Sequence, residues 1–174
     1  MKQAIIISLF LFLLTNQKLS AQTIQPYETT IDSSNTKILK GLISRTIIES
    51  DTSFKWFKQN MQLGQANANA VEAFKQNGSK FQMIIFVGTW CEDTQNLLPV
   101  FYRLVNKSGY DENNITLVAV DREKTTLDNL HKAFSIADVP TFIVMKDGKE
   151  VGRVVEYGKY GQIDKELGEI VSTL

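Results

Sequence analysis

The feature that most constrains this chain is the segment FVGTWCEDT at residues 86–94, where an apolar strand meets the start of a helix. The only cysteine of the chain, Cys91, stands at that transition. A helix start leaves backbone N–H groups unpaired, and these groups together with the helix dipole favour a thiolate over a thiol. The segment therefore predicts a nucleophilic sulfur at a strand–helix boundary. The alternative is an inert, buried cysteine that packs as a small hydrophobe.

Further landmarks accompany this cysteine. Pro99 follows it by eight residues within the same expected helix, and Val139-Pro140 precedes the apolar run FIVM at residues 142–145. Trp90, Cys91, Pro99 and Pro140 match the thioredoxin superfamily in order and spacing. In that family a tryptophan precedes the reactive cysteine, a proline kinks the helix, and a cis-proline packs against the sulfur. From about Ala68 to its end, the chain resembles this superfamily.

The resemblance implies an α/β fold in which helices flank a central mixed β-sheet. The downstream pattern agrees with it. Strands are expected at 115–120, 141–145 and 151–155, helices at about 67–76, 126–134 and 162–174, and a hairpin turn at Asp147-Gly148. The first of these helices is expected to end at Asn77-Gly78 in a left-handed conformation. We therefore predict a thioredoxin-like domain over residues 67–174.

The same resemblance assigns roles at the site. Cys91 would be the nucleophile, and Thr94 stands where disulfide-exchanging members carry a second, resolving cysteine. Because Thr94 has no thiol, Cys91 cannot form a disulfide with this position. A thiol from another molecule must therefore resolve any mixed disulfide between Cys91 and a client. We expect the Thr94 hydroxyl to donate a hydrogen bond to the sulfur and so to favour the thiolate. Ile85 replaces the buried acid that the family places six residues before the cysteine.

The substrate groove is expected to be formed by Trp90, Glu92, Asp93, Val139 and Pro140. In the family the backbone before the cis-proline pairs with an extended substrate segment. The carboxylates of Glu92 and Asp93 suit the first turn of a helix, but they are like charges beside a thiolate and oppose its formation. Glu156 is expected near the last loop of the groove, where it would add to an acidic rim.

The amino terminus has the pattern of an export signal. Lys2 is followed by an apolar stretch and then by Ser20-Ala21, a small-residue cleavage context. Residues 1–21 are therefore predicted to be a signal peptide. The apolar stretch is shorter than the roughly 20 residues that span a bilayer, so no stable membrane anchor is expected after cleavage. The predicted location is exported, either periplasmic or secreted.

Residues 22–66 are interpreted as an N-terminal helical extension. From Asn35 onward, apolar residues recur at intervals of three and four, which is typical of an amphipathic helix. They are Ile38, Leu39, Leu42, Ile43, Ile47 and Ile48. A second short helix is expected after Asp51. The usual first strand of the fold has no evident counterpart, so the sheet is expected to be one strand short.

The remaining composition excludes several functions. The 19 basic and 19 acidic side chains balance, so nucleic acid is not an expected partner. The single histidine, His131, lies away from the cysteine in the resemblance. No clustered spacing of histidine, cysteine and carboxylate suggests a metal site, and no cofactor is expected.

Two functions remain open. In the first, the chain is a monothiol thiol–disulfide oxidoreductase in which Cys91 attacks a disulfide or a sulfenic acid of a client protein and an external thiol resolves the product. In the second, it is a redox-inactive thioredoxin fold that binds peptides or proteins and keeps Cys91 for packing.

Overall fold

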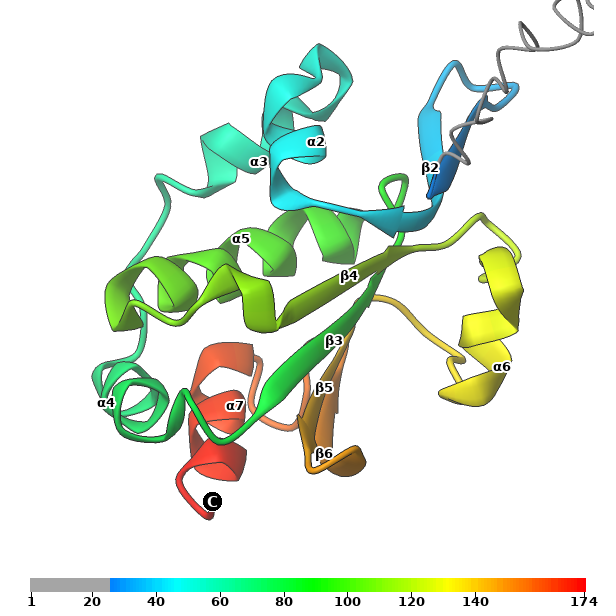
Figure 1. The fold of residues 1–174 in the computed structure, drawn as a ribbon. Coiled ribbons are helices and arrows are strands. Elements are labelled where there is room, and N and C mark those ends of the chain that lie inside the picture. Colours follow the sequence, from blue (N-terminus) through cyan, green and yellow to red (C-terminus); the bar gives the residue numbers. More distant parts are fainter. Residues whose placement is uncertain (1–25) are drawn as a thin grey trace, which may run out of the picture.

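The computed structural model describes residues 26–174, and its centre is a six-stranded sheet in the order β1-β2-β4-β3-β5-β6 (Figure 1). The strands are β1 (Tyr27–Ile31), β2 (Lys37–Ile43), β3 (Gln82–Val87), β4 (Ile115–Ala119), β5 (Thr141–Lys146) and β6 (Lys149–Val155). The α-helices are α2 (Arg45–Ser50), α3 (Lys55–Asn60), α4 (Ala68–Asn77), α5 (Glu92–Ser108), α6 (Leu130–Ala133) and α7 (Ile163–Val171). Short 3-10 turns η2 (Thr52–Phe54), η3 (Glu112–Asn114) and η4 (Leu127–Asn129) complete the elements. The expected mixed sheet flanked by helices is confirmed.

The register of the central strands brings distant segments to one edge of the sheet. β3 runs parallel to β4 and antiparallel to β5. The end of β3 therefore lies beside the start of β5, where Phe86 is paired with Thr141. Because α5 begins just after β3 and Pro140 just precedes β5, this register places the two landmark motifs side by side.

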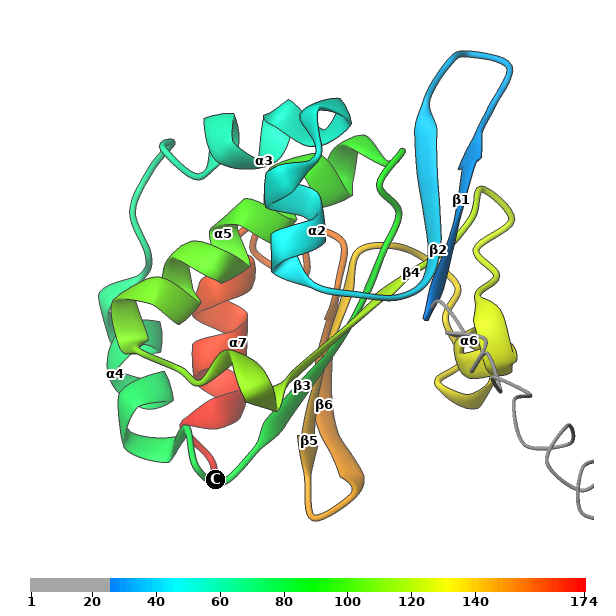
Figure 2. The same cartoon turned by 45° about the horizontal axis from the view of Figure 1, so that its top comes forward.

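Helices cover both faces of the sheet. α3, α4, α5 and α7 lie on one side, and α6 lies on the other (Figure 2). Successive side chains of β3 therefore point to two different cores. Met83, Ile85 and Val87 belong to the larger core under α5 and α7. Phe86 belongs to a smaller core with residues of the α6 segment. The strand is apolar from Met83 to Val87 because both of its faces are covered there.

The amino-terminal segment differs from the expected helical extension. Residues 37–43 form strand β2, which pairs antiparallel with both β1 and β4, so the helix expected from Asn35 is wrong over this range. The sheet is not short of a strand at this side. The spacing of the apolar residues alone led to the wrong prediction. Leu42, which the helical pattern counted as a core residue, is 42% exposed. Pairing with β1 and β4 buries Leu39 and Ile43 on a sheet face instead.

From Arg45 to Asn60 this segment is largely helical, as expected. α2, η2 and α3 follow β2, and the Asp51 side chain caps η2 by accepting from the Ser53 N–H at 2.9 Å. Phe54 and Phe57 are buried in the larger core. These short helices therefore form part of the main core and not a separate layer.

Two local predictions need correction. The helix expected at 126–134 is reduced to η4 and α6, because Asp128 and Asn129 have positive φ angles that interrupt it. Helix α4 ends at Gly78, but Gly78 has φ −57° and no left-handed stop. Glycine is needed there for space, since a Cβ atom would lie 2.8 Å from the Phe74 carbonyl oxygen.

The Asp147-Gly148 turn between β5 and β6 has positive φ at both residues, as such hairpin turns require.

The predicted signal peptide at residues 1–21 lies outside the described residues. Within residues 26–174, no helix has the length and apolar character needed to cross a membrane.

Candidate active site around Cys91

Cys91 is the residue that immediately precedes helix α5. Its N–H donates to the Gly88 carbonyl at 2.9 Å, and its own carbonyl accepts the first helical bond from the Gln95 N–H at 3.0 Å. The thiol is partly buried and is not in a disulfide. The expected position at a helix start is confirmed, and the N–H groups of the first turn of α5 lie next to the sulfur-bearing residue.

The Val139-Pro140 loop lies against the sulfur. The Val139–Pro140 peptide bond is cis, as expected. The Cys91 thiol donates a hydrogen bond to the Val139 carbonyl, with 3.3 Å between Sγ and the oxygen. The Pro140 carbonyl accepts from the Glu156 N–H at 2.8 Å, so the loop after β6 also reaches this edge, as predicted for Glu156. The structure thus brings Cys91, Val139, Pro140 and Glu156 together.

Thr94 has a different role from the one expected. Its side chain is fully buried in the first turn of α5, and its hydroxyl oxygen accepts from the Gly88 N–H at 3.2 Å. The predicted hydrogen bond from this hydroxyl to the Cys91 sulfur is not formed, and the thiol instead donates to the Val139 carbonyl. Thr94 therefore ties the helix start to the end of β3. Ile85, in place of the family's acid, is fully buried in the core of β3.

Trp90 is held by groups from other loops. Its indole Nε1–H donates to the Val120 carbonyl at 3.1 Å, and the Arg122 guanidinium lies 5.2 Å from its ring centroid. Arg122 in turn pairs with Asp32 at the turn of the β1–β2 hairpin, with 2.6 Å between nitrogen and oxygen. The backbone of Thr36 and the Arg122 side chain hold the pKa of Asp32 below its usual value. The hairpin is thus connected to the tryptophan beside the thiol.

Thr89 is a site residue that the sequence did not reveal. Its buried hydroxyl donates to the Lys37 carbonyl and accepts from the Leu39 N–H, each at 3.2 Å. Gln95 from α5 donates to the Thr89 carbonyl at 3.2 Å. Thr89 therefore fastens the loop before Cys91 to strand β2. The role of Thr89 could have been predicted only if residues 37–43 had been recognised as a strand that lies beside this loop.

The charged surroundings are mixed. Glu92 is exposed and Asp93 is partly exposed at the first turn of α5. Next to Val139, Asp138 pairs with Lys124 at 2.6 Å. His131 lies on α6, where its Nδ1 accepts from the Thr126 N–H at 3.2 Å, and it takes no part in the thiol site. Across residues 26–174, no cluster of three or more histidine, cysteine or carboxylate side chains is arranged to hold a metal ion.

Comparison with known proteins agrees with this geometry. The thioredoxin family model matches residues 63–169, which is more than half of the chain. The chain belongs to the thioredoxin family. Among curated relatives, a thioredoxin from Coprinus comatus is 33% identical over 79 residues, covering 45% of this chain and 71% of that protein. The TPR repeat-containing thioredoxin TDX from Arabidopsis thaliana is 26% identical over 94 residues, covering 54% of this chain and 23% of that protein.

Part of the chain is also similar to a solved thioredoxin structure. Thioredoxin from Fasciola hepatica is 22% identical, with a TM-score of 0.39, covering 59% of this chain and 88% of that one. The chain spans less than two thirds of the length of several curated relatives. The family match begins at residue 63 and leaves out the β1–β2 hairpin that contacts the site.

Proposed function

We propose that this protein is a thiol–disulfide oxidoreductase that works with one cysteine. The observation that carries the proposal is the position of Cys91. Its partly exposed sulfur stands at the start of α5 and contacts the carbonyl that precedes the cis-proline. Membership of the thioredoxin family supports disulfide chemistry as the reaction class and protein disulfides as the substrate class.

The chemical steps follow from the single thiol. The Cys91 thiolate attacks one sulfur of a client disulfide, a new Cys91–client S–S bond forms, and the other client sulfur leaves as a thiolate. A second, external thiolate then attacks the client sulfur of this mixed disulfide and releases Cys91 as a thiolate. The external thiol becomes joined to the client by a disulfide, so electrons balance without a second cysteine here. With a sulfenic acid, the first step releases hydroxide in place of a thiolate.

The Val139 carbonyl has a part in the first step. While the sulfur is protonated, this carbonyl accepts the thiol hydrogen. Loss of that proton frees the carbonyl, which then accepts a backbone N–H from an extended client segment laid along the loop. Trp90 and Pro140 form the walls beside the sulfur, and Glu92 and Asp93 lie at the rim.

The first test is capture of a mixed disulfide. The folded protein is incubated with a peptide disulfide of 5-thio-2-nitrobenzoate, and release of the coloured thiolate is followed together with the intact mass. We expect one equivalent of release and one peptide adduct on Cys91, with neither for Cys91→Ser. An intact thiol that reacts only after the protein is unfolded would contradict the proposal.

The second test concerns the missing resolving thiol. Thr94→Cys places a second thiol in the first turn of α5, where the Thr94 side chain now lies. We expect at least about a tenfold gain in dithiothreitol-driven reduction of insulin, since a resolving thiol within the chain has an effective concentration in the millimolar range or above. Thr94→Ser, which keeps the hydroxyl, is the matched control and should stay at the original rate. Equal rates in all three proteins would mean that resolution by an external thiol is already efficient.

A second candidate function is a peptide-binding module without redox activity. The observations that favour it are the hydrogen bond that occupies the thiol proton, the buried Thr94 in place of a second cysteine, and the acidic residues at the first turn. Such a module would bind reduced and disulfide-blocked client peptides equally and would bind them equally as Cys91→Ala. The oxidoreductase instead requires the sulfur for stable capture.

We also propose that the protein is exported. The proposal rests on the basic start, the apolar stretch and the Ser20-Ala21 cleavage context in the sequence. Periplasmic and secreted locations both fit. Mass spectrometry of the mature amino terminus after expression in a cell with a secretion pathway tests it, since retention of residues 1–21 would contradict export.

A further inference from the structure

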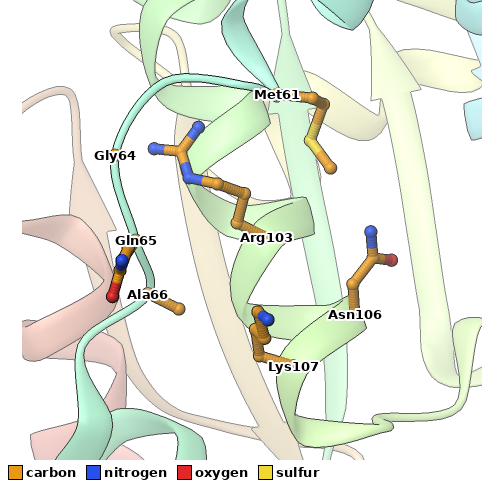
Figure 3. Close-up of a pocket in the computed structure, with 7 residues that line it drawn as sticks. All are labelled: Met61, Gly64, Gln65, Ala66, Arg103, Asn106 and Lys107. Carbon is orange, nitrogen blue, oxygen red and sulfur yellow. The ribbon is translucent and has the colours of Figure 1, made fainter.

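A hollow of about 370 Å³ lies between helix α5 and the loop that follows α3 (Figure 3). Arg103, Asn106 and Lys107 of α5 form one wall, and the loop at residues 61–66 forms the other. No acidic side chain lines it. The hollow is therefore cationic and rich in hydrogen-bond donors, and the thiol site does not use it.

Arg103 differs from the other arginines of the chain. Arg45, Arg122 and Arg153 each form an ion pair with a carboxylate. Arg103 forms none within residues 26–174, although all four arginines lie in this range. A partly buried guanidinium without a counter-charge is unfavourable, and burial lowers the pKa of Arg103. Its charge is therefore available to a ligand.

The hydrogen bonds of Arg103 leave donors free. Nη1 donates to the Asn60 carbonyl at 2.7 Å, whereas the buried Nε has no partner within the described part of the chain. Nη2 lies on the side of Gly64, where an added Cβ would be in van der Waals contact with it at 3.7 Å. In Figure 3 the guanidinium extends from α5 toward the loop at Gly64, so a ligand in the hollow meets its outer edge.

Neighbouring groups add to this donor character. The Asn106 oxygen accepts from Arg45 at 2.8 Å and points away from Arg103 in Figure 3, which leaves the Asn106 amide hydrogens as donors. Lys107 is exposed on the next turn of the wall. Asp164 is the acid whose charge acts on Arg103, but its two oxygens accept from the N–H groups of Asn67 and Lys165.

We propose that this hollow is a binding site for an anionic group of a small molecule, either a phosphate or a carboxylate. Arg103 supplies the main charge through its planar donors, and Lys107 supplies a second charge at the rim. Gly64 has φ +75° and no side chain, so no Cβ covers Nη2 on the side of the hollow that both residues line. The site is independent of the thiol chemistry at Cys91.

The test is an NMR titration of the folded, full-length protein at constant ionic strength. Sodium phosphate and sodium succinate are the two probes, and each replaces an equivalent amount of sodium chloride. We expect saturable shifts of the Arg103 Nε–H signal and of the Gly64 and Gln65 amide signals. Saturation with phosphate assigns a phosphate ligand, and saturation with succinate alone assigns a carboxylate. Linear shifts with both probes would overturn the proposal.

Variants identify the residues responsible. We expect Arg103→Gln and Lys107→Gln to weaken binding, the former by about tenfold or more, as for loss of a charge-assisted pair. Lys132→Gln, on exposed α6, removes the same charge elsewhere and should leave affinity unchanged. If Arg103→Gln does not fold, Arg103→Lys keeps the charge but loses the planar donors and should still bind more weakly. Equal weakening by Lys132→Gln would show a general charge effect and overturn the site.

Discussion

Trp90 illustrates how single residues from distant segments meet at the thiol. Its ring edge is fixed by the Val120 carbonyl, and Arg122 covers the ring. Gly88 also contacts the indole closely, since a Cβ there would lie 2.8 Å from Trp90. Asp32 holds Arg122 from the hairpin. The wall beside Cys91 is therefore set partly by a residue that lies 58 positions before Trp90 in the chain.

We predict that Asp32→Asn loosens this wall. Loss of the carboxylate leaves Arg122 without its ion pair, so Arg122 should leave the Trp90 ring for part of the time. In a Trp56→Phe background, Trp90 is the only tryptophan, and its quenching by acrylamide should increase. Asp147→Asn, in an exposed turn, is the matched control and should leave quenching unchanged.

The same pair predicts a pH dependence. The pKa of Asp32 is lowered in the folded protein. The ionised carboxylate therefore stabilises the fold and holds Arg122 at pH values above the usual carboxyl pKa of about 3.9. This stabilisation is lost as the pH falls through the lowered pKa. In the Trp56→Phe background, Trp90 fluorescence should therefore show an acid step below about pH 4. Asp32→Asn should lack this step. A step of equal size in both proteins would assign it to another carboxyl group.

At the scale of elements, the β1–β2 hairpin is built around a close approach. Gly41 has φ +119°, and a Cβ atom there would lie 2.5 Å from the Pro26 carbonyl oxygen. This approach lets β1 pair with β2 across residues 27–31 while β2 also pairs with β4. The hairpin in turn fixes Thr89 and Arg122, so its geometry affects the thiol site.

We therefore predict that Gly41→Ala is markedly destabilising. Gly109→Ala is the matched control, because Gly109 also has a positive φ but has no atom within 4 Å of an added Cβ. Gly109→Ala should lose about 1 kcal/mol from backbone strain, and Gly41→Ala should lose at least about 1–3 kcal/mol more, from overpacking and from a φ angle outside the left-handed helical region. Urea denaturation measures the difference. Equal losses would mean that β1 moves away without cost.

At the scale of the whole molecule, the amino-terminal segment and the family-matched region share one core. Leu39, Ile48, Phe54 and Phe57 are buried in the same cluster as the residues of α5. Phe57 packs edge-on against Tyr102, with 5.6 Å between ring centroids. The described protein is thus a thioredoxin domain whose core is completed by segments that precede the family match.

We predict that a chain beginning at Gln62 does not form a stable native state. It lacks these four buried side chains, each of which contributes about 1.5–3 kcal/mol, and their sum is comparable with the stability of a domain. Its near-ultraviolet circular dichroism and amide dispersion should be largely lost. A chain beginning at Pro26 keeps them all and should unfold cooperatively. Cooperative unfolding of the shorter chain would contradict the prediction.

The sequence by itself determined the strand–helix boundary at Cys91 and the Asp147-Gly148 turn, because these features depend on local signals, namely an apolar run, a helix start and an Asp-Gly pair. The cis-proline loop and the mixed sheet were expected from the family resemblance, which rests on the order and spacing of Trp90, Cys91, Pro99 and Pro140. Cys91 and Pro140 could be paired because the family resemblance supplied their arrangement. The role of Thr94 was not determined, because the direction of a hydroxyl depends on which backbone group comes near it.

Only the tertiary structure decided that residues 37–43 form a strand and not a helix. Their apolar spacing fits a helix as well as a strand, and pairing with β1 and β4 selected the strand because it satisfies backbone hydrogen bonds while burying Leu39 and Ile43. The same pairing created the contacts of Thr89 and the link from Asp32 through Arg122 to Trp90. Such contacts join residues far apart in the chain, and local sequence carries no signal for them.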